Sequence, residues 1–407
     1  MLLIGQLTVR GTSALLAPAS TYTQPILCAL TRHTSTYPNP FIDNQAYKKA
    51  SRQLRLRRQP GLRHFTTKHS SLPPNSTLSP YHPPWSPPSE ASLSIRPVLI
   101  VGAGNLGRRI ATIWASDSRP VVLYDNSLTA LASATEYITD SLASYCAVRG
   151  THPGSVTMTT CIQSAADGNA EATPWMVIDC LPEDLVLKKS NLAEVEKHLR
   201  RDCILATNSS SFRAELLADA VPESVRGRVL NTHYFIPPRN RMVEIMSTTH
   251  TADAETMFSF LVSQMRRVGL EPVIVPAGLQ STGFVFNRVW AAVKRETLAV
   301  VKEGVASPKD VDALFRDFFH SEKGPCERMD EVGLDRVMEV EKMYVDERPG
   351  LGSDAVVEWL GKEYVSMGRV GEKGSSGDGL FTKEERDRLK EMRKEERKVA
   401  VEESKGA

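Results

Sequence analysis

The stretch VLIVGAGNLGRRI, residues 98–110, decides the fold of this chain. Apolar residues lead into glycines spaced as G-x-G-x-x-G, and a helical pattern begins directly afterwards. In such a strand–turn–helix unit the first glycine makes the tight turn and the second lets a diphosphate approach the backbone. The third allows the helix to pack closely on the strand. The residues expected to form this phosphate-binding turn are Gly102, Gly104, Asn105, Leu106 and Gly107. The alternative is a glycine turn in an α/β fold that binds no nucleotide.

An acidic residue follows the next predicted strand, residues 120–124. Asp125 comes 23 residues after Gly102, which is where a carboxylate bonds the ribose hydroxyls of a bound dinucleotide. The same carboxylate would repel a 2′-phosphate. The sequence therefore predicts NAD rather than NADP as the cofactor.

Short apolar runs alternate with helical periodicity between residues 97 and 275, which is typical of parallel strands joined by crossover helices. Strands are expected at residues 97–101, 120–124, 156–160, 175–179, 203–206 and 229–235. After Pro276 the pattern is helical, and helices are expected at residues 282–303, 308–319, 333–344 and 354–367. We predict an α/β protein with an N-terminal Rossmann NAD-binding domain, residues 95–275, and an all-helical C-terminal domain, residues 276–381. The charged tail, residues 382–407, has almost no apolar stripe, and no chemistry is assigned to it.

Residues 1–94 differ from the rest of the chain in composition. They carry ten Lys/Arg against two acidic residues, and they are rich in Ser, Thr and Pro. Such a segment offers little to a core, and an Arg-rich, acid-poor start is typical of a mitochondrial transit peptide. We expect a disordered leader and a location in the mitochondrial matrix. The alternatives are a plain disordered extension and a cytoplasmic protein.

The rest of the chain is mildly acidic, because the whole chain has a net charge of only +2. An acidic body repels phosphate backbones, which argues against nucleic acid as a partner. No apolar run approaches the roughly 18 residues that a membrane span needs. The cysteines are scattered, with no CxxC and no Cys/His cluster at metal-ligand spacing, so neither a metal site nor a disulfide framework is expected.

A histidine lies near the end of the last expected strand, residues 229–235. His233 would stand at the carboxyl edge of the parallel sheet, where such folds bind ligands. Imidazole titrates near neutral pH, so it can accept a hydroxyl proton as a hydride leaves and return it in the reverse reaction. Glu244 would fix the imidazole tautomer if the chain folds back onto the ring. The alternative is a core histidine and a surface glutamate.

Several motifs occur together in one order. They are the glycine turn, CLPEDLVLK at residues 180–188, ATNSSS at 206–211, His233 with Pro237 and Pro238, Glu244, and GFVFNR at 283–288. In this order the sequence resembles the L-3-hydroxyacyl-CoA dehydrogenase superfamily over roughly residues 97–381.

The resemblance implies a role for each matching residue. His233 would be the general base and Glu244 its orienting partner. Ser210 and Asn287 would bond the reacting oxygen, although residues 209–211 also suit a helix cap. The residues implied to line the nicotinamide and ribose side of the cofactor site are Glu183 and Lys188. The resemblance further implies NAD, a small-molecule substrate and a homodimer formed through the helical domain.

Two departures from the family pattern bear on the substrate. Ile236 replaces the asparagine that usually follows the histidine motif, prolines come next, and the segment before Glu244 is one residue shorter. Residues 127–159 contain no lysine, whereas the acyl-CoA enzymes carry a lysine-rich helical hairpin there that contacts CoA. In these respects the chain also looks like the gulonate dehydrogenase and lambda-crystallin branch of the superfamily.

We expect an NAD-dependent oxidoreductase that oxidises the secondary hydroxyl of a 3-hydroxyacyl-CoA of the 3-hydroxybutyryl-CoA type, as in fatty acid β-oxidation. One alternative is a dehydrogenase of a free hydroxy acid such as L-gulonate or carnitine. The other is an NAD(H)-binding regulator or crystallin-like protein without turnover. Catalysis is favoured over binding alone because His233, Glu244, Ser210 and Asn287 are all present.

Overall fold

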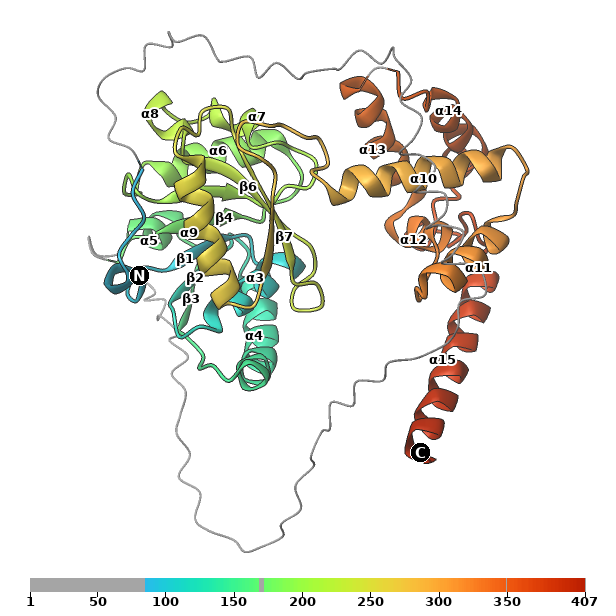
Figure 1. Ribbon diagram of the computed structural model, residues 1–407, viewed down its shortest axis with the longest axis horizontal. Helices are drawn as coiled ribbons and strands as arrows, with labels where there is room; N and C mark the ends of the chain where they lie inside the picture. The colour runs from blue at the N-terminus through green and yellow to red at the C-terminus, as the bar shows by residue number, and fades with distance from the viewer. Residues whose placement is uncertain (1–84, 168–171, 349, 407) are drawn as a thin grey trace, which may run out of the picture. The chain divides into compact units, whose positions relative to one another are not determined.

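One sheet organises the first part of the described chain. The computed structural model describes residues 85–167, 172–348 and 350–406. The sheet order is β3-β2-β1-β4-β5-β6-β7-β8 (Figure 1). The strands are β1 (Val98–Val101), β2 (Val121–Tyr124), β3 (Val156–Thr159), β4 (Met176–Asp179), β5 (Ile204–Thr207), β6 (Val229–Tyr234), β7 (Met242–Ser247) and β8 (Glu271–Ile274). Neighbouring strands pair in parallel from β3 through to β6, so the expected crossover topology is confirmed.

The last two strands were not expected from the sequence. Strand β7 pairs antiparallel with β6, and β8 pairs in parallel with β7. The residues of β7 after Met242 are buried, whereas β8 is partly exposed and contains Pro272. Strand β8 therefore lacks the unbroken apolar pattern that predicts a buried strand. Proline and an exposed face are both features of edge strands.

Helices cover both faces of the sheet, as in a Rossmann fold (Figure 1). One face is covered by α3 (Asn105–Ala115), α4 (Leu128–Arg149) and α9 (Ala254–Arg267). The other is covered by α5 (Ile162–Asp167), α6 (Leu185–Glu196), α7 (Glu215–Ala218) and α8 (Glu223–Arg226). Strands β1, β4 and β5 are buried along their whole length because they lie between these two layers.

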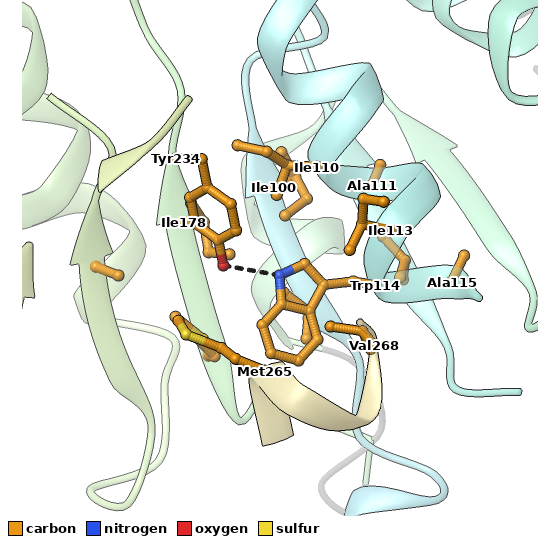
Figure 2. Packing of buried hydrophobic residues seen from close by; sticks show 14 of the residues in the cluster. Ile100, Ile110, Ala111, Ile113, Trp114, Ala115, Ile178, Tyr234, Met265 and Val268 are labelled. Carbon is orange, nitrogen blue, oxygen red and sulfur yellow. Dashed lines mark hydrogen bonds between the residues drawn. The ribbon is translucent and has the colours of Figure 1, made fainter. Parts of the chain in front are cut away.

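The core beneath α3 and α9 fixes the helix that follows the glycine turn. Ile110 and Trp114 of α3 pack with Ile100 of β1 and Ile178 of β4 (Figure 2). The Trp114 Nε1–H donates to the hydroxyl of Tyr234 on β6 at 3.0 Å. Both rings are buried, so this bond satisfies two polar groups that would otherwise lose free energy away from water.

The second part of the chain is helical, as expected. Its elements are α10 (Phe286–Lys302), α11 (Pro308–Phe319), α12 (Pro325–Val332), α13 (Leu334–Glu347), α14 (Asp354–Glu363), the 3-10 helix η1 (Val365–Met367) and α15 (Lys383–Gly406). Helix α12 was not expected. Its first turn is held from α11 by Asp312, whose carboxylate accepts the N–H groups of Cys326 and Glu327 at 2.8 and 2.9 Å. None of the helices in the described ranges is long and apolar enough to cross a membrane.

The charged tail is not separate from the helical domain, which corrects the boundary placed after residue 381. Arg386 of α15 is 2% exposed and forms an ion pair at 2.8 Å with Asp330 of α12, which is 0% exposed. The Asp330 carboxylate also accepts the N–H groups of Leu380 and Phe381. Leu389 packs against the apolar core of the helical domain, which includes Leu298 and Met329. The beginning of α15 is therefore part of the packed domain.

The start of the ordered body also differs from expectation. Residues 1–84, which hold most of the expected leader and transit peptide, lie outside the described residues. Trp85, however, packs edge-on against Phe260 of α9, and its backbone N–H donates to Asp253. The short helix α2 (Glu90–Leu93) buries Leu93, and Glu90 pairs with Arg119 at 3.0 Å. A disordered leader that ends at residue 94 is therefore wrong for residues 85–94.

Candidate active site

The glycines of the turn differ in what they do. The fold requires Gly102 and Gly107 for steric reasons, but it does not require Gly104. A Cβ on Gly107 would lie 1.8 Å from the carbonyl oxygen of Gly102, and one on Gly102 would lie 2.8 Å from that of Cys180. A Cβ on Gly104 would meet no protein atom within 4 Å. Gly104 therefore keeps a surface clear at the N-terminus of α3, where unpaired backbone N–H groups favour a diphosphate. The turn fits the expected dinucleotide, with Asn105 and Leu106 in the first helical turn.

Asp125 stands beside this turn at the end of β2. One carboxylate oxygen accepts the N–H of Ala103 at 2.8 Å, and the other accepts the N–H of Ser127 at 2.8 Å. Each oxygen has a second lone pair, so the carboxylate retains acceptor capacity for ribose hydroxyls. The position suits the predicted NAD-selective role of Asp125.

The antiparallel pairing of β6 and β7 brings the predicted base and its partner together. In the strand register His233 lies opposite Glu244. The His233 Nδ1 lies 2.8 Å from the Glu244 Oε2, and the two residues are 5% and 2% exposed. The chain therefore folds back so that Glu244 contacts the imidazole, which is the condition for Glu244 to fix its tautomer.

Glu244 also accepts hydrogen bonds from the beginning of α10. Its Oε1 accepts the N–H groups of Val285 and Phe286 at 3.0 and 2.9 Å. Burial alone would raise the pKa of the Glu244 carboxyl, but the hydrogen bonds from His233 and Phe286 outweigh it and hold the pKa below its ordinary value. Glu244 is therefore a carboxylate and only accepts hydrogen bonds.

An ionised Glu244 fixes the protonation pattern of the ring. Because the carboxylate cannot donate, His233 Nδ1 must carry the proton, which leaves Nε2 as the acceptor in the neutral imidazole. Phe284 stacks on the ring with centroids 5.0 Å apart, and Phe235 lies at 4.8 Å. The imidazole is therefore in contact with two aromatic rings, one stacked on it and one tilted against it.

The serine turn after β5 is built on Glu183. Its Oε1 accepts the Ser209 hydroxyl at 2.7 Å and the N–H groups of Ser210 and Ser211 at 3.1 and 2.8 Å. The Ser209 Oγ accepts the N–H of Phe212. The next helix, α7, begins only at Glu215 and has Ala214 as its N-cap, so the helix cap suggested for residues 209–211 is wrong. The Ser210 side chain is left exposed at the top of the turn.

Lys188 occupies a different place from the one implied by the family resemblance. Its ammonium donates to the Asp179 carboxylate at 2.9 Å and to the Leu181 carbonyl at 3.0 Å, and Glu183 lies 3.6 Å away. With the residue 2% exposed and its donors occupied, Lys188 cannot line the cofactor site. Lys188 is instead a buried cation next to Glu183. Because Glu183 holds the serine turn, Lys188 stabilises that turn indirectly.

Ser210 and Asn287 lie on segments tied to the histidine. Asn208 in the serine turn accepts the N–H of Tyr234, the residue after His233, at 2.8 Å. Asn287 lies in the first turn of α10, directly after the Phe286 N–H that binds Glu244. Among the residues the structure describes, neither the Ser210 hydroxyl nor the Asn287 amide has a hydrogen-bond partner. Both side chains are therefore available to a ligand.

Sequence reasoning missed the residues that hold the pair in place. The sequence indicates no role for Asn208 beyond its motif, and none for Phe284 or for the backbone amides at the start of α10. The signal for the α10 contact is Gly283, whose φ of +76° sets up the turn into the helix. Metal chemistry was not expected, and no group of three or more His, Cys, Asp or Glu in the described ranges is placed to hold a metal ion.

The chain combines a Rossmann domain with a buried histidine–carboxylate pair, and comparison with known proteins identifies its family. Residues 97–278 match the family model for the NAD binding domain of 3-hydroxyacyl-CoA dehydrogenase, and residues 283–379 match the model for its C-terminal domain. The chain therefore belongs to the 3-hydroxyacyl-CoA dehydrogenase family.

Individual relatives show how far the likeness extends. A 3-hydroxyacyl-CoA dehydrogenase-like protein of Cochliobolus heterostrophus is 41% identical over 38% of this chain and 32% of its own length. The 3-hydroxyadipyl-CoA dehydrogenase of Escherichia coli is 32% identical over 71% of this chain and 59% of its own length. The solved structure of (S)-3-hydroxybutyryl-CoA dehydrogenase from Ralstonia eutropha superposes with a TM-score of 0.60 at 25% identity, covering 71% of this chain and 99% of that one. This chain therefore spans only a part of the first two relatives.

Proposed function

We propose that this protein interconverts a 3-hydroxyacyl-CoA and its 3-keto form, with a short acyl chain of the 3-hydroxybutyryl type, as a step of fatty acid oxidation. The observation that supports the proposal is the buried His233–Glu244 pair with its free Nε2. When bound, NAD accepts the hydride from the substrate carbon. The protein's part is to hold the hydroxyl, take its proton and keep the site dry.

His233 takes the hydroxyl proton at Nε2 as the carbonyl forms. The imidazolium that results keeps its Nδ1 proton on Glu244, so positive charge forms next to an existing negative charge. Phe284 stacks on one face of the ring and His233 is 5% exposed, and the low exposure to water strengthens that attraction. In the reverse direction the same nitrogen returns the proton.

Ser210 and Asn287 orient the reacting oxygen in this proposal. A hydroxyl and an amide can both donate to the oxygen as it becomes a carbonyl. Each is carried by a segment bonded to the catalytic strands, Ser210 through Asn208 and Asn287 through the amides on Glu244. Their placement follows from the same contacts that place the base.

The experiment is a substrate panel on the full chain, monitored through NADH absorbance. We expect acetoacetyl-CoA to be reduced with NADH in strong preference to NADPH. Turnover of L-gulonate or carnitine with no turnover of acetoacetyl-CoA would replace the proposal with the free hydroxy acid alternative. That alternative is supported by α4, which follows β2 and contains no lysine.

The partner proposed for the helical domain is a second copy of this chain. Large apolar side chains are exposed on α10 and α11, namely Val289 at 61%, Leu314 at 71%, Phe318 at 78% and Phe319 at 59%. Exposed apolar side chains that contact one another, as Phe318 and Phe319 do, are typical of an interface. Light scattering on the purified protein should give twice the chain mass, and Phe318→Glu should return it to the monomer. A monomeric wild type at micromolar concentration would reject the dimer.

Mitochondrial import remains a proposal that rests on the composition of residues 1–94. Fluorescent protein fused behind residues 1–84 should accumulate in mitochondria if the segment directs import. Fluorescence spread through the cytosol would reject it.

A further inference from the structure

Two neighbouring arginines on α3 share one aromatic ring of α4. The guanidinium carbons of Arg108 and Arg109 each lie 5.0 Å from the ring centroid of Tyr137. The Arg109 Nη1 donates to the Tyr137 hydroxyl at 3.0 Å, and the Arg108 Nη1 donates to the Ser133 hydroxyl at 2.9 Å. Both arginines also donate to the Asn105 side-chain oxygen, at 3.3 and 3.2 Å. The three residues of α3 share one face because they are three and four positions apart.

In the part of the chain that the structure describes, this arginine pair has no counter-charge. Within the described ranges no carboxylate lies within 4.0 Å of either guanidinium, and Glu136, next to Tyr137 on α4, forms no ion pair with them. Each hydrogen bond above goes to a neutral oxygen. The Arg108 Nε is buried without a partner. Two cations side by side repel, and the N-terminal turns of a helix disfavour positive charge further. An anion would relieve all of these costs at once.

The pair lies beside the loop that follows the proposed base. The Arg109 Nη1 is 3.4 Å from the carbonyl oxygen of Pro237, four residues after His233. Helices α3 and α4 contain one other Lys or Arg, Arg149, which ends α4 and bonds Ser116 at the opposite end of α3. Arg108 and Arg109 are therefore the cations that these two helices present near the site.

We propose that Arg108, Tyr137 and Arg109 form a subsite for an anionic group of the substrate remote from the reacting carbon. The proposal rests on the proposed function. Planar guanidinium groups bind phosphate and carboxylate through paired N–H donors, and Tyr137 holds both in place. The anion is either a phosphate of a CoA carrier or a second carboxylate on the acyl chain. In the CoA case the arginine pair does the work that lysines after β2 would otherwise do.

The test uses the full-length Arg108→Gln/Arg109→Gln variant, with Arg266→Gln, which removes one positive charge elsewhere, as the control. Arg266 is exposed on α9 and has no ion pair within the described ranges, so its loss changes the net charge without touching the subsite. We expect the KM for acetoacetyl-CoA to rise roughly ten- to a hundredfold in the double variant with kcat within about twofold, because uniform binding is lost. The KM for acetoacetyl-pantetheine, which lacks the nucleotide phosphates, should not change. If the anion is a carboxylate, the KM rises instead for the pantetheine thioester of 3-oxoadipate alone.

Direct binding separates this proposal from the proposed function. Calorimetric titration with CoA should show binding to wild type and the control and at least tenfold weaker binding to the double variant, with the NADH affinity unchanged. Wild type that binds CoA through the arginines but turns over no thioester would reject the function and leave the subsite. Normal turnover with unchanged KM values in the double variant would reject the subsite. A matching loss of NADH affinity would also reject it, because the arginines would then serve the cofactor diphosphate.

Discussion

Glu244 serves two neighbours, with one carboxylate oxygen for each. Oε2 accepts a hydrogen bond from the proton-bearing nitrogen of His233, and Oε1 accepts hydrogen bonds from the two backbone amides at the start of α10. The sequence could suggest the first contact, because His233 and Glu244 stand in a motif. It could not suggest the second, because backbone amides leave no trace in the sequence. Glu244 is thus a structural residue as well as the partner of the base.

His233→Gln should lower kcat by roughly 10² to 10⁴, the usual worth of a positioned acid–base group. The NADH affinity should stay near the wild-type value, since the glycine turn is elsewhere on the sheet. Glu244→Gln should lower kcat less, and it should also lower the melting temperature because an anion is lost from the start of α10. Turnover that survives in a folded, NADH-binding His233→Gln protein would reject this mechanism.

The stabilising effect of Glu244 should depend on pH in one direction. Its pKa in the folded protein is lowered by the bonds from His233 and Phe286 against the effect of burial, so folding favours the ionised form. The stabilisation is complete above the unfolded pKa of about 4.3 and is lost as the pH falls through the folded pKa. The difference in unfolding free energy between wild type and Glu244→Gln should be constant from pH 7 to about 5.5 and shrink below it. Urea denaturation across pH 7 to 3 measures this, and a difference that grows in acid would contradict it.

At the scale of elements, most of the sheet followed from the sequence and its last two strands did not. Buried parallel strands such as β1 and β4 show as unbroken apolar runs, which makes them easy to find. Strand β8 has a proline and an exposed face, and α12 begins where Asp312 of another helix caps it. A helix or strand whose ends are fixed by residues distant in the sequence is therefore hard to predict from its own local sequence pattern.

The glycine turn gives a paired prediction. Gly104→Ala should leave the melting temperature near wild type, because its Cβ meets no protein atom, but should weaken NADH binding at least tenfold by blocking the diphosphate. Gly107→Ala should instead lower the melting temperature, because its Cβ would lie 1.8 Å from the Gly102 carbonyl oxygen. Calorimetric NADH titration and thermal melts distinguish the two. Equal effects of both variants on stability would show that Gly104 is needed by the fold itself.

At the scale of the whole molecule, the boundaries predicted from composition leave out residues at both ends that pack against the folded domains. The segment before residue 95 looks like leader, yet Trp85 and Leu93 pack on the sheet domain. The segment after 381 looks like solvated charge, yet Arg386 is buried against Asp330. Individual buried residues determine both boundaries. The average composition of a segment does not reveal such residues.

A chain that begins at Ser92 should melt several degrees below one that begins at residue 84. The shorter chain lacks the Trp85–Phe260 contact and the Glu90–Arg119 ion pair. A loss of about 1 to 2 kcal/mol lowers the melting temperature by roughly 2 to 8 °C in a domain of this size. Thermal melts of the two truncations, with the full chain as reference, give the comparison, and identical midpoints would show that residues 85–91 do not stabilise the body.

Arg386→Met should destabilise the helical domain, because it leaves the Asp330 carboxylate buried with backbone donors but no counter-charge. Breaking a buried ion pair on one side costs about 3 to 5 kcal/mol. The double variant Arg386→Met/Asp330→Asn should recover part of the loss, since no buried charge is left unpaired. Denaturant unfolding of the two variants tests this. Single and double variants that both match wild type would show that α15 is only peripheral.

The pairing of β6 with β7 also explains how this protein can alter the loop beside its substrate. Residues 235–241 join the two strands, and His233 faces Glu244 because the backbone ladder between the strands sets the register. A slip by one residue would turn one of the two side chains to the other face, whereas a change in the loop need not disturb the ladder. The alignment of the catalytic pair is thereby uncoupled from loop length. Evolution can vary the loop to change which substrates are accepted without rebuilding the chemistry.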